Sequence, residues 1–382
     1  MKQVRFPFLD LSDVNRNYIE ELHNAAIRVI DSGRYIGGVE VKLFEESLAT
    51  ACQASHAIGV STGLDALRLI LSAWVEMGKL KKNDGVIVPA NTFIASVLAI
   101  VHAGLRPVFV DPDPETFCIS ASGIDQACET DSGIKAVMPV HLYGNVAWNQ
   151  EIRRTITDRE LLVIEDTAQA IGAVSTEQGL FGSAHAGALG HAAAFSFYPT
   201  KNIGALGDAG AIVTHDTELA TTVRQLANYG SDRRYHNIYA GFNCRLDPIQ
   251  AAMIRAKLPD TLAANSRRFA RVVAYENEIR HPLVIRPRIS PNVTDQVWHQ
   301  YVIRVVDNHR DELQQHLADN GVETDIHYPI PPHRQPCFSY LPKQHLPISD
   351  QLASEVLSLP VSDTTSVADA AEIARIINRF NP

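Results

Sequence analysis

The chain has 382 residues, of which 46% are hydrophobic and 20% charged, and its formal net charge is −9. This composition is typical of a globular protein with room for two domains. The negative charge argues against nucleic-acid binding, no apolar run approaches the roughly 18 residues of a membrane span, and the N-terminus lacks an apolar signal core. The five cysteines form no CxxC pair, which favours a reduced, cytoplasmic protein without a metal site.

Apolar runs alternate with helical patterns through the first two-thirds of the chain. Residues 59–74 read as a strand end, a turn and a helix, and residues 91–104 as a second helix. Short apolar runs bounded by Gly, Pro or acids follow the pattern of buried parallel strands, at 85–90, 107–111, 136–143, 161–166 and 192–197. This order predicts an α/β domain with a mostly parallel central sheet flanked by helices.

The predicted order of helices and strands changes after about residue 245. Residues 247–280 read as helix, with Pro259 as an interruption. Strands are predicted at 298–306 and 323–330, together with a helix at 310–321 and two closing helices. We therefore expect a large domain over residues 1–250 and a smaller α+β domain over residues 251–382.

One lysine is set in a long stretch without charge. Between Glu177 and Asp208, Lys201 is the only charged side chain. Such surroundings desolvate an amine and make it more nucleophilic, although a surface loop is the alternative. Asp166 ends the strand at 161–166 and Lys201 follows the strand at 192–197, so both lie at carboxyl strand ends, where open sheets bind ligands. A lysine Schiff base to pyridoxal phosphate needs such an amine and acid, whereas a helix cap or salt bridge is the alternative for Asp166.

A phosphate site is predicted where the strand ending at Val60 turns into a helix. Gly63 lets backbone N–H groups approach an anion at a helix N-terminus. Asp65 opposes this interpretation mildly, because it already complements the helix dipole.

Several motifs together resemble one family. The segments "HAIGVSTGLDAL", "VIVPANTFIAS", "VIEDTAQAIGA", "AAAFSFYPTKNIGALGDAGAIVT", "NYGS" and "GFNCRLDPIQAA" occur in this order. They resemble the DegT/DnrJ/EryC1/StrS sugar-nucleotide aminotransferases, which use pyridoxal 5'-phosphate on the type I aminotransferase fold. The resemblance implies that Lys201 forms the Schiff base, that Asp166 faces the pyridine nitrogen and that Gln169 lies near the ring hydroxyl.

The same resemblance implies further cofactor contacts. Phe93 stacks on the ring, and the phosphate is held by Thr62, Gly63, Leu64 and Ser196. Many members have Thr where this chain has Leu64, so one hydroxyl contact is absent here. Asn243 reaches the phosphate of the neighbouring subunit, which implies a homodimer with shared active sites.

The substrate is indicated by features near these motifs. The stretch around Tyr198 resembles enzymes that aminate C3 of a 3-keto-6-deoxyhexose linked to a nucleotide, commonly dTDP, with L-glutamate as amino donor. His327 and His333 are placed near the sugar by the same resemblance, and a proline-stiffened loop is the alternative. Arg233 and Tyr235, in a basic stretch, are candidates for contact with the pyrophosphate and substrate, and a solvated loop is the alternative.

The implied product is an amino-deoxy sugar for a surface glycan, such as a lipopolysaccharide O-antigen or an S-layer glycan, or for a glycosylated natural product. The alternatives are an aminotransferase for a 4-keto sugar or a 3-keto uronic acid, and a catalytically silent regulatory protein that senses pyridoxal phosphate or a sugar.

Overall fold

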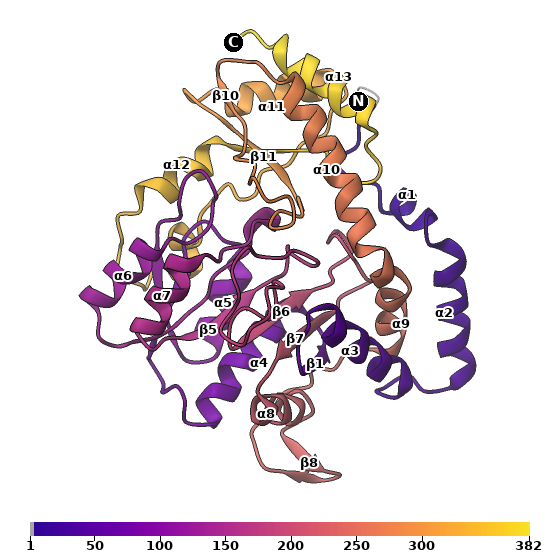
Figure 1. The fold of residues 1–382 in the computed structure, drawn as a ribbon, viewed down its shortest axis with the longest axis vertical. Coiled ribbons are helices and arrows are strands. Elements are labelled where there is room, and N and C mark those ends of the chain that lie inside the picture. Colours follow the sequence, from indigo (N-terminus) through magenta and orange to yellow (C-terminus); the bar gives the residue numbers. More distant parts are fainter. Residues whose placement is uncertain (1–3) are drawn as a thin grey trace.

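A seven-stranded sheet organises most of the chain in the computed structural model, which describes residues 4–382 (Figure 1). Its strand order is β1-β7-β6-β5-β4-β2-β3. The strands are β1 (His56–Val60), β2 (Gly85–Pro89), β3 (Arg106–Val110), β4 (Ile134–Val137), β5 (Leu162–Asp166), β6 (Ala192–Ser196) and β7 (Gly210–Thr214). The pairs from β3 to β6 are parallel and β7 is antiparallel to both its neighbours. The predicted α/β class with a mostly parallel sheet is confirmed.

Helices cover both faces of this sheet. They are α1 (Leu11–Arg16), α2 (Ile19–Ser32), α3 (Val39–Ala51), α4 (Gly63–Glu76), α5 (Ile94–His102), α6 (Ala121–Thr130), α7 (Gln150–Asp158), α8 (Thr217–Ala227) and α9 (Pro248–Lys257). Side chains alternate along each strand, so Val86 and Val88 of β2 pack with α4, α5 and α8, whereas Ile87 packs with α6 and α7. Helices α3 and α9 cover the part of the second face that Phe195 of β6 supplies. Within residues 4–382, none of the helices combines the length and apolarity that crossing a bilayer requires.

The C-terminal third builds a second sheet, of order β10-β11-β12, which lies at the top of Figure 1. Its strands are β10 (Val284–Ile285), β11 (Tyr301–Val305) and β12 (Val356–Leu359). The helices around it are α10 (Thr261–Glu278), α11 (Arg310–Asp319), α12 (Pro347–Glu355) and α13 (Val367–Asn378). Pro259 lies in a 3-10 turn, η2 (Leu258–Asp260), between α9 and α10, as its missing N–H predicts.

Two predicted strands differ from the structure. The run at 136–143 stops being a strand at Val137, because Pro139 follows and the chain enters a 3-10 turn, η1 (Leu142–Gly144). The run at 323–330 makes a single bridge to β12, between Asp325 and Ser358, before Pro329 removes the next backbone donor. The strand that completes the second sheet is β12, which follows α12 directly.

The second sheet has its own hydrophobic core. Tyr275 of α10, Tyr301 of β11, Leu313 of α11 and Ile373 of α13 are each fully buried there. Helix α9 instead packs beside α2 and α3, against the large sheet. The division of the chain at residue 250 stays a prediction, since α9 and α10 form one nearly continuous helical run across it.

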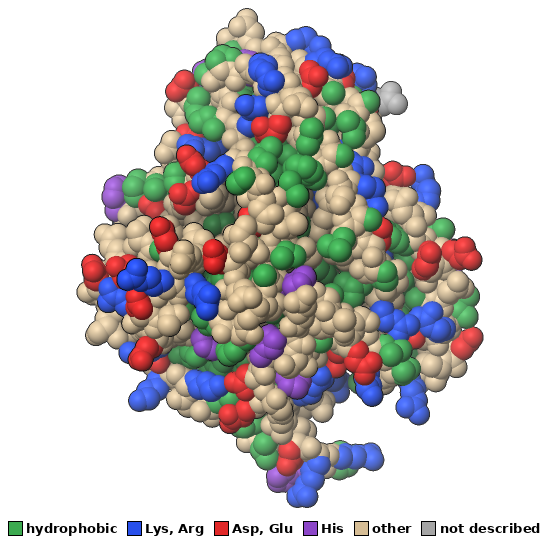
Figure 2. Space-filling view, in the orientation of Figure 1, with side chains coloured by type: hydrophobic (Ala, Val, Ile, Leu, Met, Phe, Trp, Pro, Cys, Tyr) green, Lys and Arg blue, Asp and Glu red, His purple; other side chains and the backbone are tan. Residues whose placement is uncertain are grey.

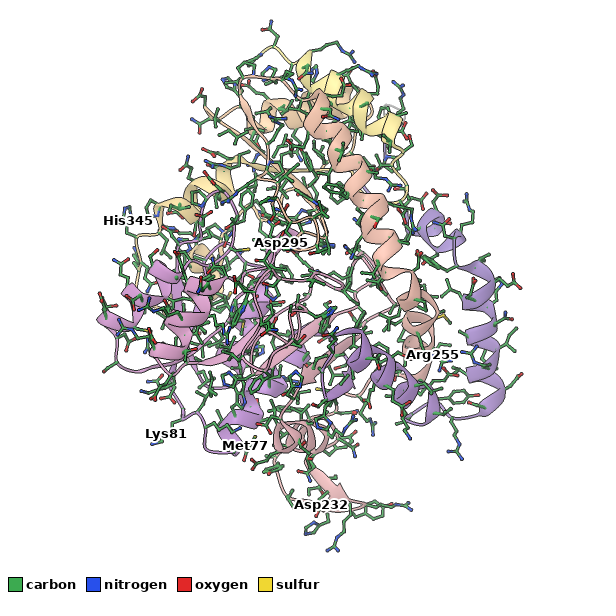
Figure 3. The ribbon with its side chains drawn as sticks, in the orientation of Figure 1. Met77, Lys81, Asp232, Arg255, Asp295 and His345 are labelled. Atoms are coloured by element: carbon green, nitrogen blue, oxygen red, sulfur yellow. The ribbon has the colours of Figure 1, made fainter. Side chains whose placement is uncertain are left out.

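A small hairpin projects from the far end of the molecule. Strands β8 (Ser231–Arg233) and β9 (His236–Asn237) form it, and Asp232 marks its position at the bottom of Figure 3. Basic side chains gather on this projection in the space-filling view (Figure 2). Every residue from Asp232 to Ile238 is exposed, and the hydrogen bonds that their side chains form stay within residues 229–237.

Candidate active site

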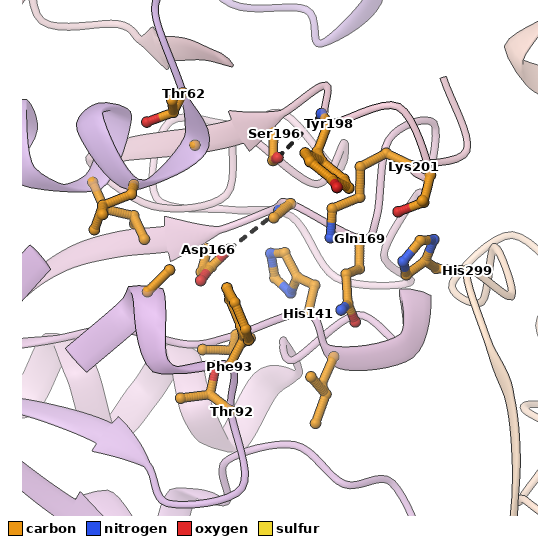
Figure 4. A pocket seen from close by; sticks show the side chains of 18 of the residues that line it. Thr62, Thr92, Phe93, His141, Asp166, Gln169, Ser196, Tyr198, Lys201 and His299 are labelled. Atoms are coloured by element: carbon orange, nitrogen blue, oxygen red, sulfur yellow. Dashed lines mark hydrogen bonds between the residues drawn. The ribbon is translucent and has the colours of Figure 1, made fainter. Parts of the chain in front are cut away.

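A cavity of about 480 Å³ opens beyond the carboxyl ends of β5 and β6. This is the edge at which open parallel sheets bind their ligands. The N-terminus of α4, the end of β5 and the turn after β6 line it together with residues 299–300 and 327–328, and Figure 4 shows Thr62, Asp166, Lys201 and His299 around it. Ten of the residues predicted for the site line this one cavity: Thr62, Gly63, Leu64, Phe93, Asp166, Gln169, Ser196, Tyr198, Lys201 and His327.

Lys201 extends into this cavity from the turn after β6. Its backbone N–H donates to the carbonyl of Tyr198 over 2.9 Å, which closes the turn and aims the side chain toward Asp166 and Gln169 (Figure 4). Burial lowers the pKa of the Lys201 amine to about 8, and the negative charge of Asp166 opposes this shift. The amine of Lys201 is therefore largely desolvated, and it is half-protonated near pH 8.

Asp166 presents its carboxylate to the same cavity from the last position of β5. The hydroxyl of Ser96 donates to Asp166 Oδ2 over 2.7 Å, and the Ala168 N–H donates to Oδ1 over 3.2 Å. The Ser96 hydroxyl also lies 2.8 Å from that of Thr92, one helical turn before it. These bonds fix the direction of a carboxylate that is only 7% exposed.

The neighbouring acid, Glu165, points to the opposite face of β5. Its carboxylate is fully buried and accepts three backbone N–H bonds of 2.9 Å, from Gly187, Leu189 and Gly190. It also lies 2.9 Å from Nε2 of His141, whose Nδ1 accepts the N–H of Ala147. Since Nδ1 is the acceptor, His141 carries its proton on Nε2 and donates to Glu165. Glu165 therefore anchors the loop before β6, and Asp166 is the acid that faces the cavity.

The first turn of α4 forms an anion cradle. Thr62 caps this helix by accepting the Asp65 N–H over 2.9 Å, which leaves the N–H groups of Gly63 and Leu64 without helical partners. A Cβ at Gly63 would lie 2.7 Å from Cβ of Ser196, so this close approach needs glycine. Asp65 points away from the cradle, because its carboxylate binds Ser61 and Arg68. Free N–H groups and the helix dipole suit a phosphate here.

Aromatic and amide side chains form the wall opposite Lys201. The ring of Phe93 lies 5.2 Å from that of Tyr328, tilted by 39°. Gln169 accepts the Tyr143 N–H over 2.6 Å and donates to the Tyr328 hydroxyl over 3.3 Å, so its amide orientation is fixed. The donor set and the half-exposed face of Phe93 fit the phosphate, pyridine nitrogen and ring of pyridoxal phosphate, and Lys201 supplies an amine that could bond its aldehyde.

Three polar residues near the site, of which Ser96 and His299 are buried, were not predicted. Ser96 could have been noticed as the one hydroxyl inside the apolar helix at 94–102. His299, whose Nδ1 lies 3.0 Å from Asn202 Oδ1, has a pKa held well below its usual range by burial and by the charges of Lys201 and Arg268. Tyr328 lies in the predicted strand at 323–330 but was assigned no role, since a tyrosine beside several prolines carries no signal of its own.

Two of the three residues predicted to contact the sugar lie at the cavity, and the third lies elsewhere. Tyr198 is half-exposed at the cavity, and His327 lines the cavity with its Nδ1 2.8 Å from the Ser358 hydroxyl. His333 lies away from the cavity, where its Nε2 is 3.1 Å from Asp350 Oδ1 and its ring packs near Phe109.

The remaining candidates do not reach the cavity of their own chain. Arg233 and Tyr235 lie on the projecting hairpin, where Tyr235 is 86% exposed. Asn243 is exposed beside Asn228, with which it forms a β-bridge. Their predicted roles thus need a second chain.

Known proteins resemble this chain along nearly its full length. The dTDP-3-amino-3,6-dideoxy-alpha-D-galactopyranose transaminase of Aneurinibacillus thermoaerophilus is 43% identical over 374 residues, which cover 98% of this chain and 99% of that protein. The erythromycin biosynthesis sensory transduction protein EryC1 of Saccharopolyspora erythraea is 41% identical, covering 93% and 94%. A crystal structure of S. venezuelae DesV in complex with a ketimine intermediate matches with a TM-score of 0.90 at 36% identity, covering both chains completely. The profile of the DegT/DnrJ/EryC1/StrS aminotransferase family matches residues 17–378, and the chain belongs to this family.

Proposed function

We propose that this pyridoxal-phosphate-dependent aminotransferase moves an amino group from L-glutamate to C3 of a dTDP-linked 3-keto-6-deoxyhexose. The observation that carries this proposal is the desolvated amine of Lys201 facing the fixed carboxylate of Asp166 across one cavity. The name of the A. thermoaerophilus relative supports the dTDP carrier and the position of amination.

The cofactor would be held by groups that the chain already orients. The N–H groups of Gly63 and Leu64, with the Ser196 hydroxyl, would bind the phosphate, and Asp166 would pair with the ring nitrogen. Phe93 would cover one ring face. When bound, pyridoxal phosphate supplies the electron sink that stabilises negative charge at the carbon bearing the nitrogen.

Lys201 is the group placed to move protons. An amine with a pKa of about 8 exchanges protons readily near neutral pH, and general acid–base catalysis of this kind contributes about 10²–10⁴-fold. Because Lys201 lines the same cavity as Asp166, it would take a proton from the donor carbon and later deliver one to the sugar carbon. Ser96 and Ala168 keep Asp166 aligned throughout.

The charge of the cavity wall helps to distinguish between the candidate sugars. Among the side chains that line it within residues 4–382, Lys201 is the one lysine or arginine. A 3-keto uronic acid would bring an extra carboxylate that no lysine or arginine of this chain other than Lys201 meets at the cavity, so any further cation for it would have to come from a second copy. Apolar side chains such as Leu64, Leu67 and Val140 instead suit a 6-deoxy methyl group.

We also propose that the enzyme works as a homodimer with shared sites. Exposed apolar side chains gather on α2 and in the segment leading to α3, namely Ile27, Ile30, Tyr35, Ile36 and Val39. Such a patch is typical of an interface. It supports a second copy, whose Asn243 and hairpin would reach this chain's cavity.

Subunit mixing tests the shared site. Lys201→Ala and Tyr235→Ala chains are each expected to be inactive or impaired alone. In a mixed dimer, one of the two sites would combine an intact Lys201 with an intact Tyr235 of the other chain, so activity should return. If each chain completes its own site, mixing restores nothing.

A half-reaction experiment tests the chemistry. The purified protein is treated with glutamate until the cofactor absorption changes to that of its amino form, and is then offered dTDP-linked 3-keto and 4-keto sugars and a 3-keto uronic acid separately. Recovery of the original spectrum with the 3-keto-6-deoxy sugar supports the proposal. Recovery only with the 4-keto sugar or the uronic acid overturns the substrate. No response to glutamate favours a regulatory binder, the role that the name of the S. erythraea relative suggests.

A further inference from the structure

A second, enclosed cavity of about 20 Å³ lies on the other side of the turn that carries Lys201. It shares Thr200 and Lys201 with the active-site cavity, and it is otherwise closed by α1, α9, α10 and Asp363. A space of this size holds a single water-sized particle, since about 10–15 Å³ is the minimum. It is too small for an amino acid or a sugar.

The walls of this cavity carry an excess of buried positive charge. Lys257 is 4% exposed and Arg268 is 8% exposed, and both line it. Within residues 4–382, neither cation lies within ion-pair distance of a carboxylate. Burial lowers the pKa of Lys257 to about 8 and that of Arg268 to about 10, and the charge of Asp363 offsets only part of the desolvation of Arg268.

The one carboxylate among the residues that line this cavity within the described chain is already engaged. Asp363 accepts from Arg267 Nη2 over 2.9 Å and from Arg271 Nη1 over 3.3 Å, so two arginines share its charge. Lys257 donates to two neutral oxygens only, Asn15 Oδ1 at 2.6 Å and the Gly204 carbonyl at 2.8 Å.

Arg268 has weaker contacts still. Its Nη1 reaches the carbonyls of Trp298 and His299 at 3.4 Å each, which are long for hydrogen bonds. A guanidinium has five N–H donors, so most of its capacity is unused by these contacts.

From this arrangement we propose that the small cavity binds one monovalent inorganic anion, with chloride as the ion that fits, between Lys257 and Arg268. A neutral water would satisfy N–H groups but would leave both charges uncompensated. A divalent oxyanion is excluded by volume.

The anion would act on the segment that positions Lys201. Lys257 holds the Gly204 carbonyl at one end of this turn. Asn202 in its middle donates to Asn265 Oδ1 over 2.9 Å and contacts His299 Nδ1 at 3.0 Å. A negative ion bound beneath these residues would tie α9 and α10 to the turn and stabilise it. This inference concerns the chain's own cations and does not depend on the substrate or on catalysis.

Thermal unfolding of the holoenzyme at constant ionic strength tests the site. Sodium chloride is exchanged for sodium gluconate, whose anion is too large for the cavity. The midpoint should rise with chloride by about 2–4 °C and then level off, as binding to one site requires. The Lys257→Met protein should lose this dependence, whereas Lys343→Met, in an exposed loop, should retain it. An equal chloride dependence in wild type and Lys257→Met would overturn the proposal.

Crystals of the unmodified protein soaked in bromide give a result that needs no variant. Anomalous scattering from one bromide between Lys257 and Arg268 is expected. A cavity with water density and no bromide signal would refute the anion site, even if the Lys257→Met protein failed to fold. Neither measurement involves transamination, so failure here leaves the proposed function untouched.

Discussion

Replacing Lys201 by methionine in the cofactor-free protein should make the fold more stable at neutral pH. The burial that prepares this amine for chemistry lowers its pKa from 10.5 to about 8. That difference corresponds to about 3 kcal/mol, since one pKa unit is worth about 1.4 kcal/mol. Methionine has a similar length and no charge, so it fills the space without the desolvation cost.

The pH dependence of this effect has a definite sign. Below pH 8 the lysine is protonated in both the folded and the unfolded chain, and the folded chain bears the full cost. Between about 8 and 10.5 the unfolded chain keeps the proton that the folded chain has lost, so the stability of the wild type rises with pH. The advantage of Lys201→Met should therefore be about 3 kcal/mol at pH 7, about 1.4 kcal/mol at pH 9.5 and close to zero above pH 10.5.

Urea unfolding at pH 7 and pH 9.5 measures this difference. Lys343→Met, which removes an exposed lysine, serves as the control and should change stability equally at both pH values. If Lys201→Met is less stable than the wild type at pH 7, or if its advantage does not shrink with pH, then the amine of Lys201 is not desolvated as described.

Further variants probe the groups around Lys201. Gly63→Ala places a Cβ 2.7 Å from that of Ser196, so α4 must shift. The dissociation constant of the cofactor, measured by absorption titration, should then rise by about tenfold or more. An unchanged affinity would show that the first turn of α4 does not bind the phosphate. Ser96→Ala removes a 2.7 Å hydrogen bond to Asp166, which should cost about 1.5–3 kcal/mol in urea unfolding, and a loss below 0.5 kcal/mol would show that this bond is unimportant. Glu165→Gln replaces one carboxylate oxygen, which accepts backbone N–H bonds, with an NH₂ group that cannot accept them. We expect the free energy of unfolding to fall by about 3 kcal/mol or more, and a near-neutral result would contradict the anchoring role.

The central sheet and the Lys201–Asp166 pair could be predicted because both depend on short, local patterns in the sequence. Apolar runs mark buried strands, and parallel strands place their carboxyl ends at one edge, so an acid after one run and an amine after another must be close. The antiparallel direction of β7 has no such local mark. The strand expected at 323–330 was wrong, because this segment forms a single bridge to β12 and no continuous ladder, and Pro329 lacks a backbone donor.

Contacts between distant segments could not be predicted without the family. Tyr328 meets Phe93 and Gln169 only because the C-terminal third folds over the sheet. His333 shows the reverse, since Asp350, 17 residues away, holds it outside the cavity. Whether Arg233, Tyr235 and Asn243 complete a partner's site remains a prediction, because it depends on contacts between chains.

The adjacent acids of β5 link the assembly of the sheet to the capture of the cofactor. A slip of β5 by one residue would exchange the two faces: in one direction Asp166 would take the place of Glu165 among the backbone N–H groups of the 187–190 loop, and in the other Glu165 would take the place of Asp166 at the cavity. Asp166 is one methylene too short for the first task, and the longer Glu165 would obstruct the second. A misregistered chain would thus be unable to retain pyridoxal phosphate. The yellow colour of the holoenzyme can therefore serve as a folding reporter, visible before any activity is assayed.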